Sequence, residues 1–308
     1  MTPTVSIIIV SYNTREETLD CLRSVHRETR DTAFEVIVID NDSADGSAEA
    51  IAAEFPGLTL IANRENVGFG GANNIAARQA RGEFVLLLNP DTVILDRAVD
   101  RLVAFARAHP DRGIWGGRTL FGDGTLNPTS CWRGMTLWGL FSWAVGLSNL
   151  MPHNPLFNFD GYGGWKRDEV REVDTVTGCF LLIRRTLWDE LGGFDPDFYM
   201  YGEEADLCLR ARGRGARPTI TPEAEIIHYG GRSETVPADK IVRLMRAKVT
   251  LARKHWGAAK LGAGLGILRL LVGLRAAGYG LAARLGGARP GFGEKAAIWR
   301  SSDASSLS

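Results

Sequence analysis

The chain has 308 residues, in which 36 Lys and Arg balance 36 Asp and Glu. This length suits one large α/β domain with extensions or two domains, and the balanced charge gives no reason to expect nucleic acid as a partner. The four cysteines are widely spaced and form no CxxC pair. That spacing argues against a disulfide framework or a zinc site, and it favours reduced thiols in a reducing compartment. No secretory signal is visible before the first apolar run.

Short apolar runs alternate with helical patterns from the N-terminus onward. β-branched runs of this kind are typical of parallel strands that are buried on both faces. The alternation predicts a doubly wound sheet. We expect strands over Val5–Val10, Glu35–Ile39 and Phe84–Leu88, and helices over Glu16–Glu28, Ser47–Phe55 and Gly71–Ala80.

Polar loops follow the three predicted strands. They are Ser11–Asn13, Asp40–Ser43 and Asn89–Asp91. Because ligands of doubly wound sheets bind beyond the carboxyl ends of the strands, we expect these loops to form a binding edge.

An apolar segment interrupts this pattern between residues 130 and 165. Its uncharged part, Gly134–Met151, just reaches the length of a membrane span, but Thr136, Ser142 and Asn149 dilute it. We interpret the segment as an insertion, and two alternatives stay open. It packs on the domain, or it contacts a lipid-like acceptor.

The C-terminal part is basic, with thirteen Lys and Arg between Lys240 and Arg300. Ala238–His255 predicts a basic helix. Leu261–Leu285 predicts an amphipathic helix whose uncharged runs are too short to span a membrane. It suits peripheral contact with an anionic membrane surface or packing on the protein's own core, and both stay open. Residues 301–308 predict a disordered tail.

Three carboxylates, Glu203, Glu204 and Asp206, cluster at a predicted helix start. Val173–Arg184 predicts a further strand before them. Acidic residues at a helix start can simply stabilise its first turn. Their density and the aromatic residues before them favour proton abstraction from a hydroxyl nucleophile.

Six motifs occur in an order that resembles family-2 glycosyltransferases of the GT-A fold, especially their bacterial rhamnosyltransferase-like branch. The resemblance covers residues 4–255. The motifs are Val5–Asn13, Val38–Ser47, Asn66–Asn74, Leu88–Asp91, Gly178–Leu182 and Gly193–Leu207.

The resemblance implies an α/β architecture with a Rossmann-like, mostly parallel sheet flanked by helices and a C-terminal amphipathic helical extension. Residues 1–237 would form the GT-A catalytic domain. Within it, 1–118 bind the nucleotide sugar, 130–165 are the apolar insertion, and 173–237 form the acceptor and catalytic half. Residues 238–300 would form the basic helical extension, before the tail at 301–308.

The resemblance also implies a site for a divalent cation, Mg²⁺ or Mn²⁺, at the donor diphosphate. A cation offsets the charge that develops on a nucleoside diphosphate leaving group. Asp91 and His228 would be its ligands. Asn89 stands where many members carry the first Asp of a DxD motif, which weakens the expected metal dependence. Arg232 would help to neutralise the diphosphate.

Further residues would bind the nucleotide sugar, expected as a dTDP- or UDP-sugar. Asp40 would accept a hydrogen bond from the ring nitrogen of uracil or thymine. Loop residues would line the nucleoside pocket or lie beside the donor. They are Ser11, Tyr12 and Asn13 for the pocket, and Asn66, Gly68 and Asn74 for the donor.

Glu204 occupies the place of the family's catalytic base, which is usually Asp, and Glu203 and Asp206 are the alternatives. The expected activity is an inverting transfer, with dTDP-rhamnose as the leading donor and a cell-surface or lipid-linked saccharide as the acceptor. It would take place in the cytoplasm, at the inner face of the cell membrane. The alternative is a non-catalytic module that binds nucleotide sugar or membrane.

Overall fold

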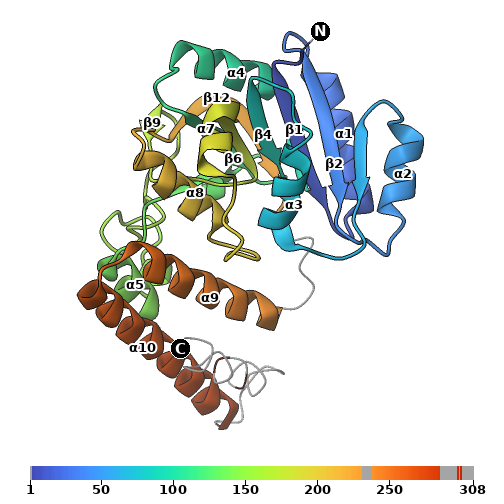
Figure 1. Ribbon diagram of the computed structural model, residues 1–308. Helices are drawn as coiled ribbons and strands as arrows, with labels where there is room; N and C mark the ends of the chain where they lie inside the picture. The colour runs from blue at the N-terminus through green and yellow to red at the C-terminus, as the bar shows by residue number, and fades with distance from the viewer. Residues whose placement is uncertain (1, 231–236, 285–296, 298, 300–308) are drawn as a thin grey trace. The chain divides into compact units, whose positions relative to one another are not determined.

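A computed structural model describes residues 2–230, 237–284, 297 and 299 (Figure 1). The predicted tail 301–308 and the predicted diphosphate ligand Arg232 therefore lie outside the described residues. The chain divides into two compact units. Unit 1 comprises Met1–Trp132, Lys166–Tyr199 and Glu203–Ser233, and unit 2 comprises Arg133–Trp165, Met200–Gly202 and Glu234–Ser308.

A ten-stranded mixed sheet forms the centre of unit 1. Its main path runs β3-β2-β1-β4-β11-β6-β12-β5, where β7 pairs with β6 and β9 with β12. Strands β3, β2, β1 and β4 are mutually parallel, whereas β11 is antiparallel to β4 and β6. The strands are β1 (Val5–Ser11), β2 (Phe34–Asp40), β3 (Thr59–Ala62), β4 (Phe84–Leu88), β5 (Thr92–Ile94), β6 (Ile114–Leu120), β7 (Leu126–Asn127), β9 (Arg171–Glu172), β11 (Phe180–Arg184) and β12 (Thr219–His228), and β8 (Cys131–Trp132) pairs separately with β10 (Thr175–Val176).

Helices cover both faces of this sheet. The main apolar core packs one face of β1, β2 and β4 against α1, α2 and α4. Alternate residues of the same strands are also buried, and α3 and α7 contact the strands from the other side. The helices of unit 1 are α1 (Arg15–Glu28), α2 (Ser47–Glu54), α3 (Gly68–Ala77), α4 (Ala98–Ala108), η1 (Pro128–Ser130), α7 (Arg185–Leu191) and α8 (Glu203–Arg212).

The predicted fold class is confirmed, with two local differences. Val173–Arg184 was expected as one strand, but it contains β10 and β11 with a turn between them. The helix expected from Gly71 begins at Gly68, whose φ of 76° turns the chain into α3. A left-handed φ costs glycine little, which explains the residue at this bend.

Unit 2 has its own apolar core, built from α5 (Leu137–Ala144), α9 (Pro237–His255) and α10 (Ala258–Arg284), with α6 (Leu147–Leu150) beside α5. The insertion packs on the C-terminal helices: Leu140 of α5 lies in one cluster with Met245 of α9 and Leu268 of α10. Two partly buried groups of opposite charge, Asp160 and Lys248, interact electrostatically in this unit. Burial raises the pKa of Asp160 to about 6 despite the nearby Lys248, and burial lowers the pKa of Lys248.

Helix α10 differs from its prediction in one respect. By length and composition α10 can cross a membrane. Its most apolar stretch of 18 residues has a mean hydropathy of 1.4, and 22% of that stretch is buried. The expectation that its short uncharged runs rule out a span is therefore wrong by this measure. Its arginines are spaced widely enough to leave one long apolar helix. Leu268, Leu271 and Val272 are buried, whereas a second row of leucines is exposed: Leu270, Leu274 and Leu281.

Candidate active site

Asp40 is the last residue of β2, and one of its carboxylate oxygens has no hydrogen-bond partner among the described residues. Its Oδ1 accepts a hydrogen bond from the backbone N–H of Ser43 at 3.0 Å. Its Oδ2 is buried and has no partner among the described residues, and the side chain is 3% exposed. A buried acceptor without a donor is costly, so this oxygen fits a ligand that brings an N–H group.

The loop after β1 braces the loop after β2. Asn13 accepts a hydrogen bond from Ala44 N–H at 2.8 Å, and its own N–H donates to Ser43 Oγ at 2.9 Å. The Ser11 hydroxyl is fully buried beside Thr18, so it supports the loop from within. Of the three predicted pocket residues, only Tyr12 and Asn13 keep side chains with solvent access.

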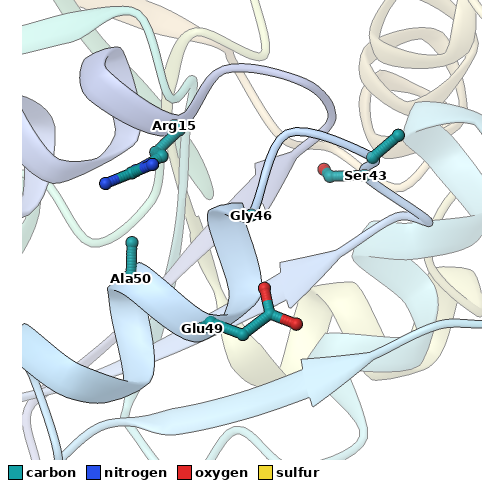
Figure 2. A pocket seen from close by; sticks show the side chains of 6 residues that line it. Arg15, Ser43, Gly46, Glu49 and Ala50 are labelled. Carbon is teal, nitrogen blue, oxygen red and sulfur yellow. The ribbon is translucent and has the colours of Figure 1, made fainter.

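An open pocket of about 590 Å³ lies at the starts of α1 and α2 (Figure 2). Its lining contains neither Asp40 nor the acidic cluster, and the sequence analysis did not single it out. Arg15 and Glu49 give it charges of both signs. The lining residues are Arg15, Ser43, Ala44, Gly46, Glu49 and Ala50.

Asn66 organises the turn that leads into α3. Its Oδ1 accepts hydrogen bonds from Asn41 Nδ2 at 2.9 Å, from Gly68 N–H at 2.9 Å and from Tyr199 Oη at 3.1 Å. The Asn41 Oδ1 in turn accepts from Val67 N–H at 3.2 Å. The turn at Asn66–Gly68, which is predicted to lie beside the donor, is thus hydrogen-bonded to Asn41, the residue that follows Asp40.

Asn74 has a structural partner that the sequence analysis missed. Its Nδ2 donates to Phe194 O at 2.8 Å, and its Oδ1 accepts from Phe194 N–H at 2.9 Å. Both the nitrogen and the oxygen of the Asn74 side-chain amide are therefore hydrogen-bonded to Phe194. Asn74 therefore holds the segment before α8, and its place beside the donor stays a prediction.

Asn89, Asp91 and His228 come together at one edge of the sheet. His228 Nε2 lies 3.4 Å from Asp91 Oδ1 and 3.3 Å from Asn89 Nδ2. Burial disfavours a charged imidazole, but the neighbouring thiol of Cys179 and the Asp91 carboxylate outweigh it and raise the pKa of His228 to about 10. Cys179 lies in the Gly178–Leu182 motif, yet nothing in its spacing indicated a place beside His228.

These residues fit a divalent cation that keeps part of its coordination for substrate. Within the described ranges no group of three or more His, Cys, Asp or Glu could hold a metal by itself. Mg²⁺ is commonly bound through one or two carboxylates together with phosphates and water. Asp91 offers a carboxylate, only 7% exposed, and His228 offers a ring nitrogen that must lose its proton to become a ligand.

Asp206 is engaged in the structure of α8. Its carboxylate is fully buried and accepts from Arg210 Nε at 2.6 Å. Arg210 also donates to Leu191 O and Gly193 O, so the pair fastens α8 to the segment before it. A carboxylate held by an arginine is a weak base, which favours the other two acids for proton transfer.

Glu203 and Glu204 form no ion pair with another residue that the structure describes. Glu203 is 3% exposed, and its Oε2 has no hydrogen-bond partner within the residues described. Burial, and then the charge of Glu204, raise the pKa of Glu203 well above its ordinary value. Glu204 retains some solvent access, and burial raises its pKa as well. Glu204 thus combines access with increased basicity.

The segment around β10 adjoins both groups of acids. Asn89 N–H donates to Cys179 O at 3.2 Å, just after β10. On the other side, α8 packs against β10, and the Cys208 thiol is hydrogen-bonded to the backbone of Val176. The segment from β10 to Cys179 therefore contacts both the loop that holds Asn89 and the helix α8 that holds the acidic cluster.

Known proteins resemble this chain in sequence. Residues 6–191 match the family described as glycosyl transferase family 2. The chain is 31% identical over 242 residues to the O-antigen biosynthesis protein RfbC of Myxococcus xanthus, covering 77% of this chain but 18% of RfbC. It is 27% identical over 244 residues to the N-acetylglucosaminyl-diphospho-decaprenol L-rhamnosyltransferase of Mycobacterium tuberculosis, covering 76% and 78% of the two chains. Rhamnosyltransferase WbbL of Escherichia coli is 28% identical over 236 residues, covering 73% and 83%.

Solved structures share the fold. The mannosyltransferase PcManGT from Pyrobaculum calidifontis, in complex with GDP-Man and Mn²⁺, matches with a TM-score of 0.57 and 21% identity, over 100% of this chain and 81% of that one. GalNAc-T7 with UDP, GalNAc and Mn²⁺ matches with a TM-score of 0.60 and 16% identity, over 97% and 54%. These likenesses establish the GT-A fold of unit 1's sheet and helices.

Proposed function

The chain belongs to glycosyl transferase family 2, and from this membership we propose that it moves a sugar, with inversion, from a nucleoside diphosphate to a saccharide hydroxyl. The observation that carries the proposal is that unit 1 holds both Asp91, paired with His228, and Glu204, whose pKa is raised by burial. The Asp91–His228 pair can receive a diphosphate with its cation, and Glu204 can receive a proton.

The proposed donor is a dTDP- or UDP-sugar. Uracil and thymine both present a ring N–H, and the unpaired Oδ2 of Asp40 is an acceptor suited to it. Rhamnose is the leading sugar, because two relatives are named rhamnosyltransferases. Thymine, as in dTDP-rhamnose, is our leading choice of base.

The proposed role of Asp91 and His228 is to hold a Mg²⁺ or Mn²⁺ ion against the diphosphate. The ion would supply positive charge to the leaving group. Asn89 would contribute a neutral amide beside it. Because Asn89 lacks the charge of an Asp, we expect the affinity for the ion to come mainly from Asp91 and the nucleotide.

The proposed role of Glu204 is that of the base. It accepts the proton of the acceptor hydroxyl as that oxygen bonds to the anomeric carbon. The bond from this carbon to the diphosphate oxygen breaks, and its electron pair leaves with the nucleoside diphosphate. One displacement inverts the anomeric configuration, and no covalent enzyme intermediate is needed.

We propose a lipid-linked saccharide as the acceptor, at the cytoplasmic face of a membrane. The relative from M. tuberculosis is named for a diphospho-decaprenol acceptor. Unit 2 offers surfaces that suit a lipid layer, because α9 and α10 are basic and several large apolar side chains are exposed. They are Trp138, Phe141, Val145, Leu150, Met151, Leu156, Leu270, Leu274 and Leu281.

Transfer assays test the proposal directly. Purified protein is incubated with radiolabelled dTDP-rhamnose or UDP-sugars, Mn²⁺ and N-acetylglucosaminyl-diphospho-undecaprenol. We expect label in the lipid fraction, and its loss with Asp91→Ala. Nucleotide binding without any label transfer, across a panel of donors and acceptors, would favour the non-catalytic module instead.

Sedimentation with vesicles tests the membrane component. We expect binding to vesicles that contain phosphatidylglycerol, weaker binding to phosphatidylcholine alone, and weaker binding by a Leu150→Ser, Leu274→Ser double variant. Val170→Ser in unit 1, where Val170 is 50% exposed, is the matched control. Equal binding by both variants would contradict this surface.

A further inference from the structure

We propose that Tyr199 is a positioning residue that couples the donor loop, residues 66–71, to the start of α8, where the proposed base lies. The inference rests on the proposed function, because it concerns how the donor site and the base communicate. It assigns a role to Tyr199 that the motif itself did not suggest.

The backbone of Tyr199 lies directly against the donor loop. Phe69 N–H donates to Tyr199 O at 3.2 Å. A Cβ at Gly68 would overlap this carbonyl oxygen, and the residue also has a φ of 76°. Only glycine allows so close an approach at this bend, so the two segments fit together at Gly68 without room for a side chain.

The side chain of Tyr199 makes a second connection to the same loop. Its hydroxyl donates to Asn66 Oδ1 at 3.1 Å. The same oxygen accepts from Asn41 Nδ2, and Asn41 follows Asp40, the proposed reader of the nucleobase. A chain of hydrogen bonds therefore runs from the residue beside the nucleobase site to Tyr199.

The remaining contacts carry this connection toward α8. Asn74 fixes Phe194 through both its backbone groups. A Cβ at Gly70 would lie 3.3 Å from Phe198 O and 3.8 Å from the Cβ of Glu203. The first residue of α8 thus packs directly on the donor loop, so a displacement of this loop changes the position of the helix start.

The hydroxyl bond of Tyr199 is the adjustable part of this contact. The side chain is 46% exposed, so water competes for the hydroxyl, whereas the bonds of Asn74 are more buried. A nucleotide that fixes Asn66 and Gly68 would strengthen the Tyr199 bond and hold α8 in place before the acceptor arrives. Such coupling is reciprocal, so an ordered α8 would also tighten nucleotide binding.

Hydrogen exchange of the full chain tests the coupling without an acceptor. UDP or dTDP, each with Mn²⁺, is added to the wild type and to Tyr199→Phe, which keeps the ring and loses the hydroxyl. We expect the nucleotide to slow exchange in residues 63–71 of both proteins. In residues 194–199 and at the start of α8 we expect about fivefold slower exchange in the wild type only, the equivalent of one net hydrogen bond.

Tyr201→Phe is the matched control, since it removes the same atom two residues further along the chain, and we expect it to behave as the wild type. A purely structural role for Tyr199 would change exchange equally with and without nucleotide. Equal nucleotide protection of α8 in Tyr199→Phe and the wild type would overturn the coupling, as would wild-type protection confined to residues 63–71. Protection nowhere in the wild type would overturn the nucleotide site itself and this inference with it.

Discussion

Two groups of acids in unit 1 have opposite electrostatic surroundings. Asp91 lies 3.4 Å from His228, whose pKa is raised to about 10, so the carboxylate has a positive partner. Glu203 and Glu204 have no such partner in the described part of the chain, and burial raises the pKa of each. The first group has a basic imidazole beside it, whereas burial makes the carboxylates of the second group more basic.

This difference explains how one chain can hold two carboxylate sites with different chemistry. A carboxylate beside a positive group stays charged and suits a metal ion or a diphosphate complex. A carboxylate raised in pKa takes up a proton more readily and suits a base. The variants below test this contrast, beginning with the largest expected effect.

Glu204→Gln should have the largest effect, because it removes the proposed proton acceptor and leaves the shape of the side chain nearly unchanged. We expect the turnover of sugar transfer to fall by roughly 10²- to 10⁴-fold. The dissociation constant of UDP or dTDP should stay close to that of the wild type, as measured by calorimetry. Glu203→Gln is the control and should keep most of the activity. If the two variants exchange these outcomes, Glu203 is the base.

Asp91→Asn should weaken the other group. It keeps the shape of the side chain and removes the charge that faces His228, so we expect kcat/KM to fall by roughly 10²-fold and nucleotide binding to lose its response to Mn²⁺. Calorimetric titration of UDP with and without Mn²⁺ measures this response. Asp20→Asn, an exposed change on α1, is the control. An unchanged Mn²⁺ response in Asp91→Asn would remove Asp91 from the metal site.

Asp40→Asn should change the choice of nucleotide. The amide can satisfy Ser43 N–H with its oxygen, but it then presents an N–H group where the free Oδ2 lies in the wild type. Two donors would face each other, so we expect UDP and dTDP to bind roughly tenfold more weakly. CDP, whose base has an acceptor at the ring nitrogen, should lose less affinity. A parallel loss for all three nucleotides would contradict the role of Asp40.

Sequence reasoning predicted the sheet and the residues at its edge, but it did not predict what several side chains do there. Val5–Val10 and Phe84–Leu88 are uninterrupted apolar runs, and buried strands follow from such runs directly. Asn74 and Cys179 belong to the recognised motifs, yet their partners, Phe194 and His228, depend on tertiary contacts between distant segments. No local periodicity encodes such contacts.

The same limit applies to unit 2. Its apolar insertion and basic helix could be located in the sequence, because composition marks both. The burial of Lys248 near Asp160 could not, since a lysine in a basic helix is ordinarily assigned to the solvent face. The helix α10 was expected at nearly its observed bounds, but its capacity to cross a membrane was missed because each arginine was counted as an interruption of the apolar run.

Glu203→Gln should have the smallest effect on activity. It is also the clearest test of the second group of acids, Glu203 and Glu204. The pKa of Glu203 is raised in the folded protein, so its contribution to stability is fully present below pH 4.5, its ordinary value, and is lost as the pH rises through the raised pKa. The amide cannot ionise, and it can donate a hydrogen bond. We therefore expect the variant to be more stable than the wild type by about 1–2 kcal/mol at pH 8 and nearly equal to it at pH 4.

Urea unfolding at a series of pH values measures this difference, and Glu16→Gln, an exposed change on α1, should show no comparable pH trend. A Glu203→Gln protein that is less stable than the wild type at pH 8 would mean that the charged carboxylate has a favourable partner. The contrast between the two acid groups would then fail on the side of α8, while the argument for Asp91 and His228 would stand unchanged.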